Sequence, residues 1–287
     1  MPLGISIRAN PTRPAFAGIA GLCAAAFLML APPPAAAQGR LEAHYEASLA
    51  GIQVGKGTWG IEITEDFYSA SAQGATAGLL KAFSGGTGSG AAQGRIVGGV
   101  LVPMNYIATM SSKKSETIKI SLANGNIKEF SIEPEPPVDA DRIVVTEAHK
   151  KGVVDPMTSS LVRVPGTGDV LGPEACRGGS SVFDGRLRYD LKLDFKRMET
   201  VKAEKGYHGP AVVCAIYFTP IAGYIPDRPV IRYLATERRM EIVLVPIAGT
   251  RVLVPFRLTI PTPFGAAVLE ATQFVTTATP PRVAKTQ

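Results

Sequence analysis

The sequence predicts a mainly β protein with a single curved antiparallel sheet, in the form of an incomplete barrel or β-spiral, and one or two short helices. Three observations lead to this fold class. Apolar and polar residues alternate along several segments, turn-forming residues separate those segments, and helical periodicity is scarce. Short strands spread over about 235 residues suit one bent sheet rather than two domains.

The clearest strand covers residues 187–195, where every second side chain is apolar. The residues between them are charged and alternate in sign, which suits a solvated sheet face. The same alternation predicts further strands at residues 41–49, 59–63, 240–244 and 252–260.

Helix is expected in two places only. Asp155 and Pro156 have the residue types of an N-cap and a first helical position, and they predict a short helix that extends to Val162. Residues 76–83 (TAGLLKAF) are expected to add one or two helical turns. Residues 132–141 (IEPEPPVDAD) are expected to form an acidic loop, because proline cannot donate to a central strand ladder.

The N-terminus predicts a secretory signal peptide over residues 1–37, cleaved after Ala37. Arg8 and Arg13 precede an apolar run at residues 15–31, and small residues follow it. A retained membrane anchor would need a longer run. A lipoprotein would need a small residue where Leu22 precedes Cys23, and a transit peptide would be richer in Arg and Ser. Export to the periplasm is therefore predicted.

The mature chain is predicted to be one β domain over residues 38–275, followed by a disordered polar tail at 276–287. Loss of the two arginines lowers the formal charge from +6 to +4. A charge of this size is ordinary, and without an Arg-rich stripe it argues against a nucleic-acid partner. No second segment approaches membrane-spanning length. The oligomeric state stays open.

Two cysteines remain in the mature chain, Cys176 and Cys214. An even pair in an oxidising compartment predicts a disulfide. Two reduced core thiols are the alternative. Neither cysteine belongs to a C-x-x-C pair, so a redox-exchange function has little support.

No pattern predicts catalysis, a metal or a cofactor. The Gly-rich residues 85–90 lack the ending of a phosphate loop, and they indicate either a flexible turn or a strand with close backbone approach. His44, His149 and His208 are isolated and lack metal-ligand spacing. The acids of residues 132–141 fit a solvated surface better than a catalytic pair.

A possible ligand-binding group follows the turn at Asp184 and Gly185. Arg186 and Arg188 are expected to share a sheet face with Asp190. Pairing with acids on a neighbouring strand is the leading interpretation. The alternative is that the guanidinium groups hold an anionic headgroup or glycan, because arginine is a planar multidentate donor.

Two segments carry a resemblance to a known family: residues 152–158 (GVVDPMT) and the stretch from Cys176 to residues 183–191 (FDGRLRYDL). They resemble the domain-of-unknown-function family 3108 (DUF3108), whose members are exported bacterial proteins. Weaker likeness at residues 45–59 and 101–106 extends it over roughly residues 40–275. Leu187 departs from the family's pattern, in which a second basic residue is expected, and this favours a strand there over a continuous basic cluster. The resemblance implies a curved β architecture in the envelope and implies no activity.

The sequence thus favours a non-catalytic periplasmic envelope protein that binds or carries an envelope component, such as a lipid-like or apolar ligand. A bent sheet must cover its concave face with side chains, a helix or a ligand. The alternative is a periplasmic hydrolase of a glycan or ester, with a site assembled from residues distant in sequence.

Overall fold

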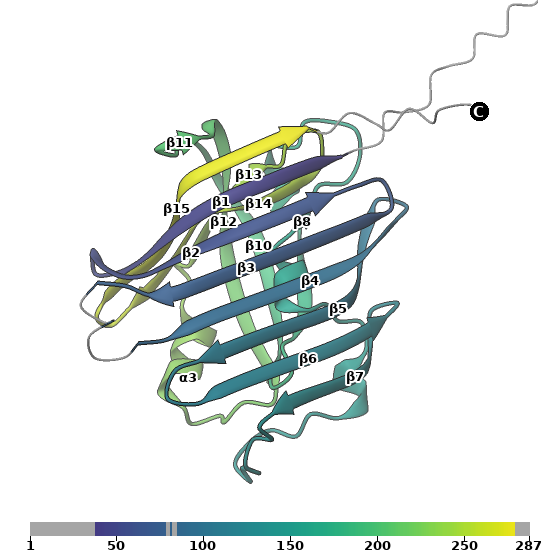
Figure 1. Cartoon of the computed structure of the whole chain (residues 1–287), viewed down its shortest axis with the longest axis vertical. Helices are drawn as coiled ribbons and strands as arrows, with labels where there is room; N and C mark the ends of the chain where they lie inside the picture. The colour runs from purple at the N-terminus through teal and green to yellow at the C-terminus, as the bar shows by residue number, and fades with distance from the viewer. Residues whose placement is uncertain (1–37, 79–80, 82–84, 279–287) are drawn as a thin grey trace, which may run out of the picture. The chain divides into compact units, whose positions relative to one another are not determined.

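The computed structural model describes residues 38–78, 81 and 85–278, which form one strongly curved sheet (Figure 1). The predicted mainly β, antiparallel fold class is confirmed. In order across the sheet, its strands are β7-β6-β5-β4-β3-β2-β1-β15-β14-β13-β12-β10-β9, with β8 beside β14 and the two-residue β11 parallel to β15. The edges of the sheet are therefore β7 and β9.

The elements before residue 165 lie mostly in one wall of the sheet. They are β1 (Gly39–Leu49), β2 (Ile52–Ile63), β3 (Phe67–Thr76), β4 (Thr87–Val97), β5 (Val100–Ser111), β6 (Ser115–Ala123), β7 (Asn126–Glu133), η1 (Glu147–Lys150), α2 (Pro156–Ser159) and β8 (Val162–Arg163).

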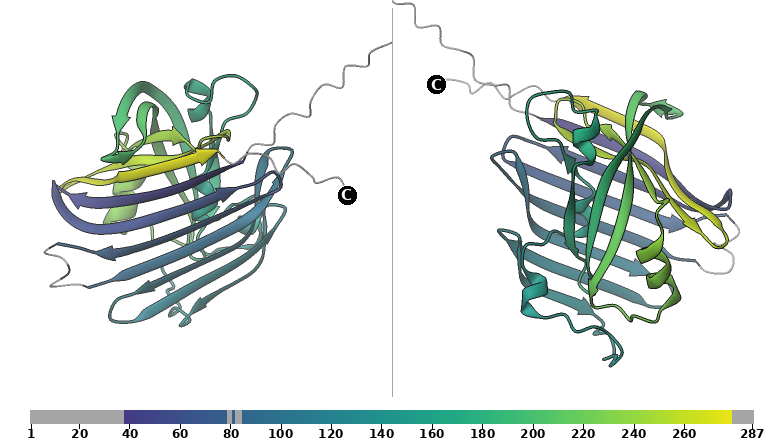
Figure 2. Two further views of the ribbon diagram at one scale, coloured as in Figure 1. Left: turned by 45° about the horizontal axis from the view of Figure 1, so that its top comes forward. Right: turned by 180° about the vertical axis from the view of Figure 1, so that it is seen from behind.

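The later elements complete the sheet. They are η2 (Pro173–Cys176), β9 (Gly178–Phe183), β10 (Arg188–Lys202), β11 (Lys205–Gly206), β12 (His208–Ala222), α3 (Pro229–Thr236), β13 (Glu241–Pro246), β14 (Val252–Thr262) and β15 (Gly265–Ala278). Seen from behind, the long green strands β10 and β12 cross steeply over the wall made by β1–β7 (Figure 2).

Apolar and polar side chains alternate along the strands, and the apolar ones lie on the face of the sheet that is buried. In β1, Leu41, Ala43 and Tyr45 are buried on the concave side, and the polar residues between them face solvent. They join a core cluster with Ile61, Tyr68, Val213, Phe256 and Phe274, contributed by strands from both walls. The concave face is thus a packed core over part of its length.

Residues 151–154, the closing segment, connect the two edges of the sheet. The Val153 N–H donates to Gly125 O at 2.7 Å, beside β7. The Val154 N–H donates to Ser181 O at 2.9 Å, and the Phe183 N–H donates to Val154 O at 3.0 Å, both on β9. The segment therefore bridges the two edges at one point on each strand, Asn126 on β7 and Val182 on β9, although it belongs to neither strand.

Several local predictions are confirmed. The strands at 41–49, 59–63, 187–195, 240–244 and 252–260 lie largely within observed strands. Asp155 caps helix α2, with Pro156 at its first position. Cys176 and Cys214 form a disulfide with their Cα atoms 5.6 Å apart, which joins η2 to β12.

Other predictions need correction. Helix α2 ends at Ser159, because Val162 pairs with Leu253 in the β8–β14 ladder. The strand β15 continues through Ala278, so residues 276–278 pair with β1 and do not belong to a disordered tail. The signal peptide at 1–37, the tail beyond 278 and most of the helical turns expected at 76–83 lie outside the described residues. Among the described residues, no helix is long and apolar enough to cross a membrane.

Candidate functional site

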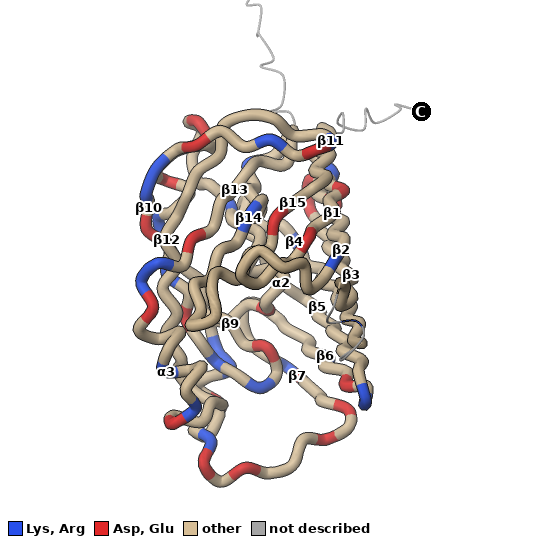
Figure 3. Tube along the Cα trace, turned by 90° about the vertical axis from the view of Figure 1, so that its left-hand side faces the viewer, with Lys and Arg blue, Asp and Glu red and all other residues tan. Residues whose placement is uncertain are grey.

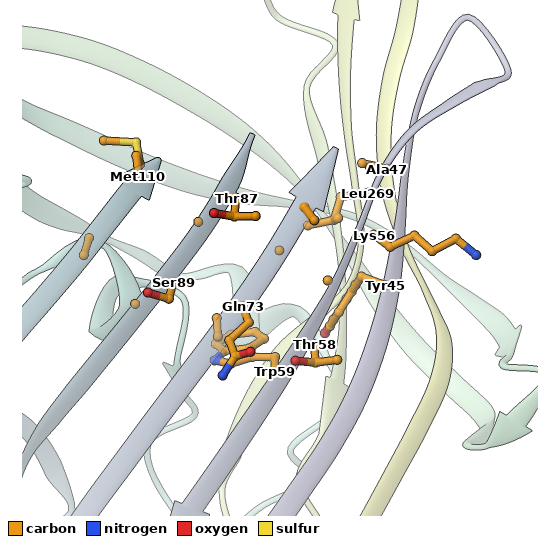
Figure 4. A pocket seen from close by; sticks show the side chains of 18 of the residues that line it. Tyr45, Ala47, Lys56, Thr58, Trp59, Gln73, Thr87, Ser89, Met110 and Leu269 are labelled. Carbon is orange, nitrogen blue, oxygen red and sulfur yellow. The ribbon is translucent and has the colours of Figure 1, made fainter. Parts of the chain in front are cut away.

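The concave face opens into a pocket of about 740 Å³ beside the packed core (Figure 4). Strands β1–β5 form one side of it, and residues from α2, β14 and β15 form the other. Pockets of this size with mostly apolar walls are the usual sites for small ligands.

Three glycines form a row across the pocket wall, the glycine row of Gly57, Gly74 and Gly88. Gly57 pairs with Gly74, and Gly74 pairs with Gly88, so the three lie side by side on β2, β3 and β4. Tyr45 on β1 and Met110 on β5 continue the same register at its two ends. The row removes side chains from three adjacent strands at the same height.

The neighbouring register is also built from small residues. Ala72 pairs with Gly90, and Gly90 pairs with Ala108, next to Trp59 on β2. A Cβ atom added at Gly88 would meet only Thr109 O within 4 Å, at 3.8 Å. The volume of the pocket therefore comes from missing side chains on the concave face.

Two aromatic residues close the pocket toward the core. The rings of Tyr45 and Trp59 have centroids 6.4 Å apart. The Tyr45 hydroxyl donates to Pro255 O at 2.6 Å, which joins β1 to β14 across the pocket. The Trp59 Nε1 is buried and has no hydrogen-bond partner in the described part of the chain. Tyr106 also lines the pocket, and burial, followed by the charges of Asp155 and Asp184, raises its pKa to about 12.

Helix α2 covers the pocket from the opposite side and is fixed by a buried cap. The Asp155 carboxylate accepts from the N–H groups of Met157 at 3.0 Å and Thr158 at 2.8 Å, and from the Thr158 hydroxyl at 2.6 Å. That hydroxyl also lies 2.8 Å from the hydroxyl of Tyr68 on β3. Burial raises the pKa of Asp155, although these hydrogen bonds lower it. The cap holds Met157 against Gly90, where an added Cβ atom would come within 3.2 Å of Met157 Cε.

The residues predicted from sequence to bind a ligand lie elsewhere. Arg186 forms an ion pair with Glu116 on β6. Arg188 Nη1 donates to Asp190 Oδ1 at 2.7 Å, and the Ser181 hydroxyl donates to the same oxygen at 2.7 Å. None of Arg186, Arg188 and Asp190 lines the pocket. Their ligand-binding role stays a prediction.

The histidines are dispersed over three elements: His44 lies on β1, His149 in η1 and His208 on β12. Within residues 38–278, apart from the undescribed positions, no three His, Cys, Asp or Glu side chains form a metal-binding group. Sequence reasoning expected that a ligand could cover the concave face but did not identify the residues that line the pocket. The spacing of Gly88 and Gly90 on β4 contained a signal. Glycine at every second position of a strand empties one face of it.

A family model described as "Protein of unknown function (DUF3108)" matches residues 44–272. The chain belongs to the DUF3108 family. This match confirms the resemblance carried by residues 152–158 and 183–191.

Among solved structures, the DUF3108 chain is similar to a beta-barrel-like protein of domain of unknown function DUF1849 from Brucella abortus. The two share 9% sequence identity with a TM-score of 0.43, over 86% of this chain and 100% of the other. A comparison with curated proteins finds no match.

The two segments that carry the DUF3108 resemblance meet in space. Residues 152–158 contain most of the closing segment and the cap of α2, and residues 183–191 contain the turn between β9 and β10. A Cβ atom added at Gly185 would lie 2.7 Å from Ile118 on β6, so this turn sits directly against the opposite wall. In this DUF3108 chain, both segments therefore build the junction between the edges of the sheet.

Proposed function

We propose that this protein is a non-catalytic periplasmic envelope protein that holds an apolar, lipid-like envelope molecule in the pocket. The glycine row is the observation that carries the proposal. Glycine weakens strand interiors and leaves nothing to pack. Gly57 is required by close backbone approach, since an added Cβ atom there would lie 2.8 Å from Gln73 O. Gly74 and Gly88 have room for a Cβ atom, so they cost stability unless the space they leave is used.

The lining of the pocket supports an apolar ligand. Carbon-rich side chains such as Val54, Met157 and Leu258 surround the glycine row. An apolar ligand that leaves water for this surface gains about 25 cal/mol for each Å² buried. An ester or carboxyl oxygen on that ligand would supply the hydrogen-bond acceptor that the Trp59 indole lacks in the described residues.

The proposed location is supported by the N-terminal sequence and by the disulfide. Residues 1–37 have the pattern of a secretory signal, and the Cys176–Cys214 bridge fits an oxidising compartment. Lipids and other apolar envelope molecules require a carrier to cross an aqueous space, which gives such a pocket a use there.

The buried carboxylates give the alternative, a hydrolase, less support. Asp155 uses its oxygens to cap α2, and Asp184 accepts from the N–H groups of Arg186 and Leu187. Both carboxylates thus accept hydrogen bonds from backbone N–H groups at the junction between the sheet edges.

Native mass spectrometry of the mature protein, purified gently from its own periplasm, tests the proposal. We expect a stoichiometric extra mass that is lost on delipidation. The Gly88→Leu variant, which places a side chain in the pocket, should carry no extra mass. Gly168→Leu is the matched control, because an added Cβ atom there meets nothing within 4 Å. A bare polypeptide mass for the wild type, or equal extra mass on Gly88→Leu, would contradict the proposal.

A further inference from the structure

Strands β3, β4 and β5 carry almost no charge. Arg95 is their only charged residue, whereas the 15 residues of β10 include arginine, lysine, aspartate and glutamate side chains along the whole strand. Figure 3 shows this contrast, because β3 and β5 are tan along their traces and β10 carries both blue and red. A sheet face that only meets solvent usually carries charges, as β10 does, because they keep a protein soluble. The uncharged wall therefore needs a different explanation.

The outward side chains of these three strands form a polar array. Burial alternates along each strand, so every second side chain points away from the concave core. The outward positions, called the neutral face, are Ser69, Ser71, Gln73 and Ala75 on β3, Thr87, Ser89, Ala91 and Gln93 on β4, and Asn105, Ile107, Thr109 and Ser111 on β5. All but Ala75, Ala91 and Ile107 carry a hydroxyl or an amide group.

The strand register places these groups in rows. Gln73 pairs with Ser89, and Ser89 pairs with Thr109, so an amide and two hydroxyls follow one another at the strand spacing of about 4.8 Å. A second row contains Ser69, Gln93 and Asn105. Among the described residues, Thr117 on β6 supplies the one side-chain hydrogen bond made by the neutral face, to Thr109 at 3.2 Å. The other hydroxyl and amide groups are therefore available to a ligand.

Two hollows lie over the neutral face. One has a volume of about 770 Å³ and is lined by Gln73, Ser89 and Thr109. The other has a volume of about 700 Å³, with Gln93 and Asn105 in its lining. Both volumes fall in the range of small-ligand sites. A ligand that crosses the strands would therefore meet polar groups in two places.

The composition of the neutral face argues against three classes of partner. An anionic lipid or polymer would need unpaired cations, but the bordering Lys56 and Lys119 are paired with Glu46 at 3.1 Å and Glu133 at 3.4 Å. An apolar surface would need several large apolar side chains, and Ile107 is the one that the face contains. Protein interfaces are enriched in aromatic residues, Met and Arg and depleted in Ser and Ala. The neutral face has the reverse composition.

We propose that the neutral face binds an uncharged glycan strand laid across β3, β4 and β5. Sugar hydroxyls both donate and accept hydrogen bonds, and so do the hydroxyls of Ser and Thr and the amides of Asn and Gln. The two surfaces are also matched in charge, because neither has to desolvate an ionised group on contact. The neutral face lies on the side of the sheet opposite the pocket, so this proposal does not depend on the proposed function.

Titration calorimetry of the mature protein with chitohexaose, an uncharged oligomer of N-acetylglucosamine, tests the proposal. We expect saturable binding that is equally strong at low and high salt, because no ion pair forms. Gln93→Ala should weaken binding about fivefold, because it removes one amide that bonds the sugar. Ser89→Glu should weaken binding at least about tenfold, because the glycan would cover an unpaired charge.

Thr200→Glu is the matched control. Thr200 is exposed on β10, outside the neutral face, so binding should change less than about twofold. Gly88→Leu should also bind as wild type does, because its new side chain points into the pocket, and it separates a failure of glycan binding from a failure of the proposed function. No binding by the wild type, an equal loss in Thr200→Glu, or tighter binding of the anionic polymer alginate would overturn the proposal. Wild-type dimers that Ser89→Glu dissociates would also overturn it, since the face would then bind a second copy of the chain.

Discussion

Phe130 on β7 and Phe183 at the end of β9 pack edge to face, with ring centroids 5.3 Å apart and an interplanar angle of 87°, although they stand on the two edges of the sheet. Lys150 adds a cation above the Phe130 ring, with Nζ 5.1 Å from its centroid. Side chains and the closing segment, rather than a strand ladder, therefore hold the edges together.

Removing this contact should destabilise the fold. Phe183 is fully buried, and we expect Phe183→Ala to cost about 3–5 kcal/mol, because truncation leaves a cavity where the edges meet. Urea unfolding measures the change. Phe195→Ala is the control, since Phe195 is 40% exposed on β10 and its loss should cost less than about 1 kcal/mol. Equal costs for the two variants would show that the junction adds nothing special.

The single tryptophan offers a direct measure of ligand binding. Trp59 is the only Trp in the chain, and it lines the pocket. A nitroxide-labelled fatty acid should quench its fluorescence with saturation in the wild type. Gly88→Leu should weaken this quenching at least about tenfold, because the new side chain occupies the space of the ligand. Gly168→Leu should behave as wild type, and full quenching in Gly88→Leu would place the ligand outside the pocket.

The buried Asp155 should make stability depend on pH. Burial raises its pKa above the ordinary value of 3.8, so the folded state binds its proton more tightly than the unfolded state. This contribution to stability therefore falls as pH rises from about 4 through the folded pKa. Asp155→Asn keeps an N-cap oxygen but cannot ionise. Its stability relative to wild type should rise between pH 4 and pH 8 in urea titrations, and a constant difference would contradict the prediction.

Glu241 should have the opposite pH dependence. Its hydrogen bonds with Arg197, and then with Lys196, lower its pKa to about 2. The stabilisation is present above the ordinary pKa of 4.5 and is lost as pH falls toward 2. Glu241→Gln should cost about 1 kcal/mol at pH 7, because the pair is partly exposed to solvent, and almost nothing near pH 2. Asp194→Asn on the exposed β10 surface is the control and should change little at either pH. A cost that persists at pH 2 would point to packing instead.

The disulfide should contribute through the unfolded chain. Cys176 and Cys214 are 38 residues apart, and closing a loop of that length stabilises by about 4 kcal/mol on the chain-entropy model. The double variant with alanine at both positions should lose close to that amount. Thiol labelling of the denatured, unreduced mature protein should find no free thiol. Two labels on each molecule would refute the bridge.

The strands predicted from the sequence are ones whose two faces differ in polarity. The strand β6 was missed despite such a difference, since its buried Ile118 and Ile120 flank the exposed Lys119. Residues 187–195 alternate cleanly, and β10 forms there. The strand β12 is buried on both faces from Ala211 to Ile216, so its continuous apolar run has no period of two to detect. Helix α3 was also missed, because its eight residues are too few for a clear helical period.

The pocket was the hardest feature to predict, because its volume depends on the absence of side chains at three glycines. Gly57, Gly74 and Gly88 lie far apart in sequence and become neighbours only through the strand register. Gly88 alone is equally compatible with a turn. Likewise, Asp155 was identified as a cap from its neighbours, but its burial depends on the curved sheet, which brings Tyr68 of β3 against Thr158 of the same helix. Arg186 pairs with Glu116 on β6, across the junction. The order of the strands along the chain does not indicate this pairing.

Gly39 and Ala278 face each other in register on β1 and β15, in the middle of the sheet rather than at either edge. The first and last described strands, β1 and β15, are therefore neighbours, and the two ends of residues 39–278, Gly39 and Ala278, lie close together. A short linker joining these residues, with new ends cut in the loop at 134–145, would leave every ladder hydrogen bond in place. Such a permuted chain would begin with the junction between the edges and end with β7. Because the permuted chain has the same contacts in a different chain order, comparing its folding rate with that of the wild type would show how much the order of the strands along the chain affects folding.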